Sequence, residues 1–160
     1  MDNMLTSLNI MLTGLKKKEQ ALLEILAISE NQKTVIESEL PLDESRELVF
    51  QMNSGKQAAI QIVKDCDNMF EAMLKEMGQE LEREQDNYKP QVKVMQEHIK
   101  RIMDIDVKIR VTEQENNRLL DGKRELFAPP NIGLKPRMSV MKDTKTVIDA
   151  YKESSKNFKG

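Results

Sequence analysis

The stretch that decides the fold is residues 56–81, KQAAIQIVKDCDNMFEAMLKEMGQEL. Apolar side chains recur in this stretch every three or four residues, at Ala59, Ile62, Cys66, Met69, Met73, Met77 and Leu81. Such spacing predicts an amphipathic helix with one buried stripe. A helix of this length cannot bury its stripe on itself, so the segments on either side must supply its packing partners.

A first flanking helix is predicted over residues 2–38, where leucine and isoleucine recur close to every seventh position. Glu19, Ser29 and Lys33 interrupt this seam at positions where a coiled coil prefers apolar side chains. The interruptions favour a globular bundle face over a long zipper. The basic run at residues 16–18 is expected to be a solvated turn of this helix. Pro41 ends the helix because proline has no N–H group and disfavours a helical residue before it.

The second helix is expected to begin at Asp43, whose carboxylate can cap the first turn. Asn53-Ser54-Gly55 predicts a kink or an interruption before residues 56–81. Beyond that point we expect a nearly continuous helix to about Asp86.

A third helix is predicted after Pro90, which suits a first helical turn because its missing N–H would be unpaired there anyway. Its apolar stripe begins at Val92 and ends before Pro129-Pro130. Four polar residues intrude on the second half of the stripe, namely Asp106, Glu113, Asn116 and Asn117. Packing is expected to loosen there.

These predictions define an all-α fold, an elongated antiparallel three-helix bundle or coiled coil over residues 1–128, since short turns make neighbouring helices antiparallel. Residues 129–160 are predicted to form a linker and an amphipathic tail with a short helix at about 144–156. An isolated helix of about a dozen residues is marginal in water, so this tail is either docked or disordered. Its apolar residues are the candidate partner-binding residues: Met138, Met141, Val147, Ile148, Tyr151 and Phe158.

Charge is unevenly distributed along the chain, although the total is only −2. Residues 1–127 carry 18 Lys/Arg against 24 Asp/Glu, a net of −6, and residues 128–160 carry 7 against 3, a net of +4. The basic tail is therefore either a solubilising segment or a segment that binds an acidic surface, including the body of its own chain.

The residue types that catalysis and cofactor binding need are scarce. The chain has one cysteine and one histidine, Cys66 and His98, and no third group is evident to orient such a pair. It lacks the two Glu-x-x-His motifs of a di-iron bundle and the Gly-rich loop of a phosphate site. We therefore expect no enzymatic activity, no metal and no cofactor. Cys66 is expected to be a small buried hydrophobic residue.

Nucleic-acid and membrane partners are also not expected. Binding of nucleic acid would call for a basic stripe with aromatic residues, which the sequence lacks. No apolar run approaches the roughly 20 residues that cross a bilayer, and the first residues do not follow the pattern of a secretory signal. A cytoplasmic location is the expectation.

Four segments resemble those of a known family. They are Leu15-Lys16-Lys17-Lys18-Glu19 followed by Leu22, Ile25 and Gln32; Asp67-Asn68-Met69-Phe70; residues 102–116, IMDIDVKIRVTEQEN; and Val147-Ile148-Asp149-Ala150-Tyr151-Lys152. With these segments the chain resembles the FlgN-like flagellar export chaperones, in the divergent form found in Gram-positive bacteria. The likeness is one of helical spacings over most of the chain, with few fixed residues.

The resemblance implies a cytoplasmic, helical and non-enzymatic chaperone. Such proteins bind the C-terminal helical regions of hook-associated (hook–filament junction) proteins and deliver them to the flagellar type III export apparatus. Their C-terminal region contacts the substrate, which here corresponds to Met141, Val147, Ile148 and Tyr151. The alternative is a structural coiled-coil protein that self-assembles without a transported client. The sequence leaves open whether the protein is a monomer or a homodimer.

Overall fold

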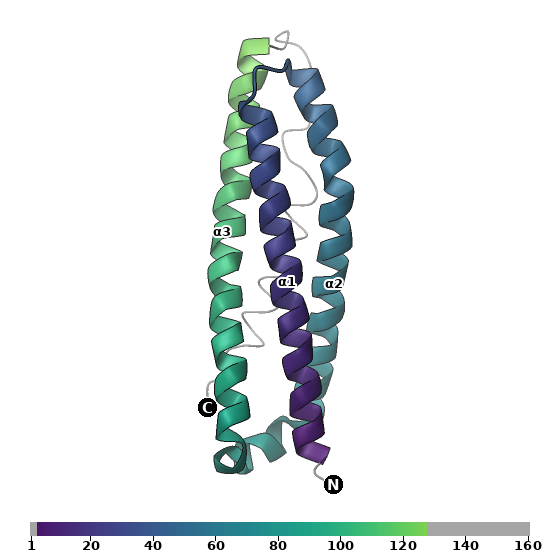
Figure 1. Ribbon diagram of the computed structural model, residues 1–160, viewed down its shortest axis with the longest axis vertical. Coiled ribbons are helices and arrows are strands. Elements are labelled where there is room, and N and C mark those ends of the chain that lie inside the picture. The colour runs from purple at the N-terminus through teal and green to yellow at the C-terminus, as the bar shows by residue number, and fades with distance from the viewer. Residues whose placement is uncertain (1–2, 128–160) are drawn as a thin grey trace.

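Three long α-helices make up the fold in the computed structural model, which describes residues 3–127 (Figure 1). Helix α1 spans Asn3–Glu37, α2 spans Leu42–Arg83 and α3 spans Lys89–Phe127, with the short 3-10 helix η1, Gln85–Tyr88, between α2 and α3. Helix α2 runs antiparallel to α1 and α3 (Figure 1). The predicted all-α three-helix bundle is confirmed. The predicted tail helix lies outside the described residues.

Helix α1 is the central element, because it packs along both α2 and α3, while α2 and α3 make few direct contacts with each other. Its buried face follows a seven-residue repeat with alternating steps of four and three. The repeat comprises Met4, Leu8, Met11, Leu15, Lys18, Leu22, Ile25, Ser29, Gln32 and Ile36. A repeat of this kind keeps one stripe facing its partners along the whole helix. One helix therefore supplies the contacts that hold the other two.

The start of α2 differs from the prediction. Leu42 is already helical, Pro41 precedes it, and the N–H of Ser45 donates to the Pro41 carbonyl at 3.0 Å. Asp43 is thus a first-turn residue rather than the cap, where its charge still complements the helix dipole.

The interruption that Asn53-Ser54-Gly55 predicts is absent from the helix. Two of these residues, Asn53 and Gly55, contact α1, and the Ser54 hydroxyl donates to the Gln51 carbonyl within α2. Gly55 lies so near Ile28 that a Cβ there would be 3.3 Å from the Ile28 Cδ1 atom, and the Asn53 side chain accepts a hydrogen bond from Gln32 at 2.8 Å.

The buried stripe of α2 is rotated relative to the predicted one. Ile62, Met69 and Met73 are only half-buried. The most enclosed positions of the central stretch are Lys56, Ala59, Ile60, Val63, Cys66, Phe70, Met77 and Leu81. The pattern of apolar residues did not predict this rotation, because the buried seven-residue repeat of Val63, Phe70 and Met77 begins with a lysine.

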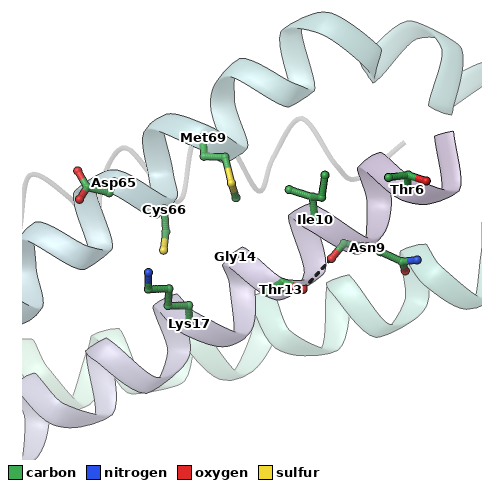
Figure 2. Close-up of a pocket in the computed structure, with 9 residues that line it drawn as sticks. All are labelled: Thr6, Asn9, Ile10, Thr13, Gly14, Lys17, Asp65, Cys66 and Met69. Atoms are coloured by element: carbon green, nitrogen blue, oxygen red, sulfur yellow. Dashed lines mark hydrogen bonds between the residues drawn. The ribbon is translucent and has the colours of Figure 1, made fainter. Parts of the chain in front are cut away.

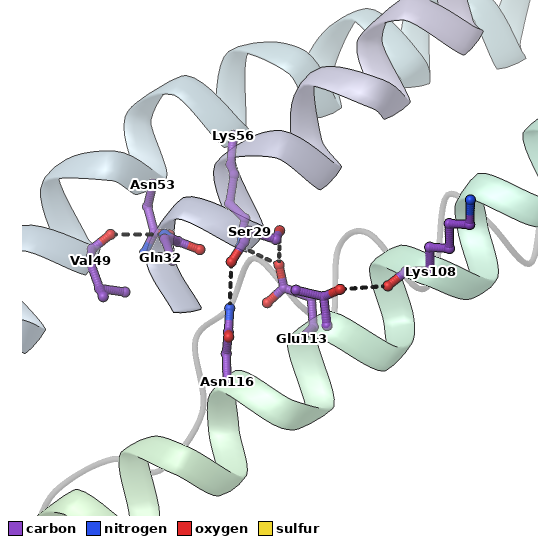
Figure 3. Close-up of polar contacts among 9 residues, drawn as sticks. Ser29, Gln32, Val49, Asn53, Lys56, Lys108, Glu113 and Asn116 are labelled. Atoms are coloured by element: carbon purple, nitrogen blue, oxygen red, sulfur yellow. Dashed lines mark hydrogen bonds and ion pairs between the residues drawn. The ribbon is translucent and has the colours of Figure 1, made fainter. Parts of the chain in front are cut away.

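That lysine takes part in a polar layer that joins all three helices (Figure 3). The Glu113 carboxylate of α3 accepts a hydrogen bond from the Ser29 hydroxyl of α1 at 2.6 Å and pairs with the Lys56 ammonium of α2. Asn116 donates to the Ser29 carbonyl at 2.9 Å. Lys56 is 0% exposed and Glu113 2%. The predicted loosening at Glu113 and Asn116 is wrong, because both residues are buried and have partners in the core.

A second polar layer lies nearer the N-terminus of α1. The Lys18 ammonium pairs with Asp67 of α2, and its side chain is only 2% exposed. Asp106 of α3 attracts the same ammonium and pairs with Arg110 at 2.9 Å. The prediction that residues 16–18 form a solvated turn is therefore wrong for Lys18. The seven-residue repeat of α1 places Lys18 on the buried face, but its partners are seen only in the structure, because they come from the other two helices.

A third buried lysine closes one end of the bundle. The Lys123 ammonium of α3 donates to the carbonyls of Ile36 and Ser38, at 3.1 and 3.0 Å, and to the Ser45 hydroxyl at 2.6 Å. The last carbonyls of a helix lack partners within the helix, and the negative end of its dipole favours a cation. Lys123 thus caps α1 from another helix.

We expect Lys56→Met to destabilise the bundle by about 3–5 kcal/mol, since it leaves the buried Glu113 charge unpaired. The double variant Lys56→Met/Glu113→Leu should recover most of this loss, because no buried charge remains. Urea unfolding followed by circular dichroism measures both effects.

The matched control is Lys75→Met, which removes an exposed pair with Glu71 at 3.8 Å. Exposed pairs contribute only about 0–1 kcal/mol, so this change should have little effect. Equal losses in Lys56→Met and in the double variant would contradict the interpretation.

Candidate docking groove

All six sequence-predicted binding residues fall in 128–160, outside the described residues: Met138, Met141, Val147, Ile148, Tyr151 and Phe158. The division of the chain at residue 128 likewise stays a prediction. Within residues 3–127, the candidate site lies at the seam between α1 and α2.

A hollow of about 510 Å³ opens on this seam (Figure 2). Its apolar lining consists of Ile10 and Gly14 of α1 and Cys66 and Met69 of α2. Polar residues, among them Asn9, Thr13, Lys17 and Asp65, complete the lining. We call this hollow the α1–α2 groove. An apolar surface with a few polar groups around it is the usual composition of a binding site in proteins.

Gly14 shapes the groove by admitting Met69. The Met69 side chain reaches across to α1 at Gly14 (Figure 2), and a Cβ on this glycine would overlap the Met69 methyl group. Two heptads further along α1, Ile28 meets Gly55 in the same antiparallel register. Close approach at both glycines therefore defines the outer seam between the two helices.

Cys66 lies on α2, one turn before Met69, with its sulfur directed toward Lys17 of α1 (Figure 2). It is a free thiol and only 8% exposed, and burial raises its pKa above the usual value. A thiol in this state is a poor nucleophile, because the thiolate is the reactive form. The prediction that Cys66 is a small buried hydrophobic residue is confirmed.

His98 is held at the α1–α3 seam. Its Nδ1 atom lies 3.1 Å from the Glu19 carboxylate and 2.8 Å from the Arg101 guanidinium, which also donates to Glu19 at 3.1 Å. The half-buried Glu19, expected to disturb the helix seam, thus ties α1 to α3. Residues 3–127 contain no group of three or more potential metal ligands. Within the same range, no helix combines the length and hydrophobicity that a membrane crossing requires.

One flank of the groove is strongly acidic. From residue 65 to 86 the exposed acids are Asp65, Glu71, Glu76, Glu80, Glu82, Glu84 and Asp86. Only Lys75 and Arg83 are basic in this stretch. We call residues 65–83 the acidic half of α2; Glu84 and Asp86 follow it before α3 begins. The sequence predicts a net negative charge for residues 1–127 as a whole, and the structure places Asp65 in the groove lining and the exposed Glu76 and Glu80 further along the same face of α2.

Comparisons of the chain with protein-family models, with curated proteins and with solved structures found no match.

Lys18 lies behind the groove, and desolvation lowers its pKa from 10.5 to about 8 despite the attraction of Asp67. The same desolvation raises the pKa of Asp67. Because the folded-state pKa of Lys18 is below the unfolded value, the unfolded chain binds more protons between pH 8 and 10.5. The Lys18 contribution to the unfolding free energy therefore increases with pH across this window.

We expect the unfolding free energy of the parent protein, relative to Lys18→Met, to increase by about 3 kcal/mol from pH 8 to 10.5, at 1.36 kcal/mol per pKa unit. Urea titrations at several pH values give the comparison. Lys17→Met changes the exposed neighbouring lysine and serves as the control. Parallel pH profiles for the parent and Lys18→Met would show that burial does not lower the Lys18 pKa.

Gly14→Ala tests whether Met69 can move. Alanine is more favourable than glycine in a helix by about 1 kcal/mol, and the atom that must yield is the free end of a flexible side chain beside open space. We therefore expect Gly14→Ala to be neutral or stabilising by up to about 1 kcal/mol, with Met69 turned into the groove. A clear destabilisation in urea, relieved by Met69→Ala, would show instead that Met69 is rigidly held.

Proposed function

We propose that this protein is a cytoplasmic, non-enzymatic chaperone that binds an amphipathic helix of a client protein in the α1–α2 groove. The groove itself is the observation that carries the proposal. It offers an apolar lining on two long helices, with polar side chains around it, and an apolar helix face can lie along such a surface in the helix-in-groove mode of recognition.

The lining suits clients with varied side chains. Met69 is unbranched and polarizable, so it can adapt its shape to different apolar groups. Gly14 contributes no side chain, which leaves the α1 backbone open to close approach. A hollow of about 510 Å³ has room for a few apolar side chains from one face of a helix. The expected binding mode is therefore shallow and adaptable.

The buried polar layers support this role from behind the groove. The Lys18–Asp67 pair lies next to the groove residues Lys17 and Cys66 in sequence and joins the same two helices. Because breaking such a pair leaves a buried charge, the two helices resist sliding past each other. The two helix backbones that form the groove thus keep their register whether or not a client is bound, while Met69 adapts.

The resemblance to FlgN-like chaperones supplies the client class. We propose that the client is the C-terminal helical region of a hook-associated flagellar protein, and that the complex is passed to components of the flagellar type III export apparatus. The tail residues matching the family's substrate-contacting region, Met141, Val147, Ile148 and Tyr151, would join the groove in this task.

Ile10→Asp tests the assignment of the groove. Ile10 is 47% exposed in the groove lining, and an aspartate there would put a charge against the apolar face of a client. We expect the affinity for the C-terminal helical region of a hook-associated protein to fall by at least tenfold, about 1.4 kcal/mol or more. Isothermal titration calorimetry with the purified proteins measures the change.

Val107→Asp is the matched control, because Val107 is 53% exposed and lies on α3, outside the groove. Its affinity for the client should match that of the parent protein. Equal losses of client affinity in both variants would show that the groove does not bind the client. If no hook-associated protein binds and light scattering shows filaments or large oligomers, the self-assembling coiled-coil alternative is correct.

A further inference from the structure

Beyond the α1–α2 groove, the same face of α2 is acidic. Asp65 and Met69 line the groove, and the exposed Glu76 and Glu80 follow on that face toward η1, seven and eleven residues after Met69. A ligand that fills the groove and continues along α2 would meet apolar groups first and carboxylates next. The surface therefore suits a basic amphipathic segment.

The chain contains one segment with this composition. Residues 138–159 include five lysines, ending with Lys159, and the apolar residues Met141, Val147 and Ile148. We propose that residues 138–159 dock in the α1–α2 groove of the same molecule, with Met141 at the groove and the lysines along the acidic half of α2. The docking itself does not depend on the identity of any client.

Charge favours this pairing over other surfaces of the bundle. On the groove side of α2, Asp65, Glu76 and Glu80 are acidic against one base, Arg83, and residues 138–159 carry five lysines against three acids. Complementary charges of this kind guide a segment to its surface and set its orientation. The lysines also follow Met141 in the chain, as the carboxylates follow Met69 along α2.

The linker is long enough to reach the groove. The Lys123–Ile36 hydrogen bond places the end of α3 level with the end of α1. At 1.5 Å per residue, Cys66 in the groove then lies about 35 Å down the bundle axis from Phe127. Met141 follows Phe127 by fourteen residues, which span up to about 46 Å when extended. The difference of about 11 Å covers the step between neighbouring helices, whose axes are about 8–10 Å apart.

The same length of chain favours docking within one molecule over exchange with a second copy. A short flexible linker gives its own segment an effective concentration on the order of millimolar. At micromolar protein, the intramolecular contact is then preferred by mass action. Docking of the same residues onto a second copy of the chain is the competing outcome, and the test must distinguish it from docking within one molecule.

Lys17 provides the test, because it is exposed and lines the groove, whereas the Cys66 thiol is buried. In the full chain carrying Cys66→Ser, Lys17→Cys and Met141→Cys, mild oxidation should form an intramolecular disulfide between residues 17 and 141. Mass spectrometry of tryptic peptides identifies the linked pair, and a non-reducing gel separates monomer from dimer. The matched control is Glu153→Cys, which falls on the opposite face of a helical segment from Val147.

We expect the 17–141 disulfide to form about tenfold faster than the 17–153 disulfide, since docking raises the local concentration of one thiol only. The excess should fall in 1 M salt and in the added variant Ile10→Asp. Circular dichroism confirms that each variant is folded, and a thiol-reactive cross-linker repeats the comparison without oxidation.

Three results would overturn the proposal. Equal rates for positions 141 and 153 indicate random encounters, linked dimers indicate exchange between two copies, and no linkage with either reagent indicates that the segment does not reach the groove. These measurements contain no client, so a negative result would overturn only the docking of residues 138–159. Client binding in the groove is tested separately by the Ile10→Asp experiment.

Discussion

The buried carboxylate of Glu113 is the point on which the arrangement of the three helices depends. A charge in the core is tolerated only when donors surround it, and its donors come from Ser29 of α1 and Lys56 of α2. Since α2 and α3 otherwise make few direct contacts, this layer is one of the places where the two outer helices are joined. A shift of either helix by one residue would leave a buried charge unpaired.

Register and binding surface are related through this constraint. Fixed register brings Gly14 opposite Met69 and Gly55 opposite Ile28, and the first of these contacts forms one wall of the α1–α2 groove. The polar layers therefore do more than satisfy one another. They determine which side chains of α1 face which side chains of α2 on the outside of the bundle, and so determine the shape that a helical ligand would meet.

The helical class, the number of long helices and most turns were predictable from sequence, because periodicity and proline positions are local signals. The pairing of charges was not. Lys18 and Lys56 lie 49 and 57 residues from their partners Asp67 and Glu113. From the sequence alone, each of these four charged residues is expected to be solvated or to disrupt the packing. The groove escaped prediction for the same reason, since it exists only where a glycine of one helix meets a methionine of another.

Lys123 has a consequence for everything that follows it in the chain. By capping α1 from α3, its ammonium holds the last turns of α3 against the α1–α2 turn. Phe127, the last residue of α3, lies only four residues later. If residues 138–159 dock as proposed, the ten residues 128–137 limit how far along the bundle they can reach, since an extended chain spans at most about 3.3–3.6 Å per residue.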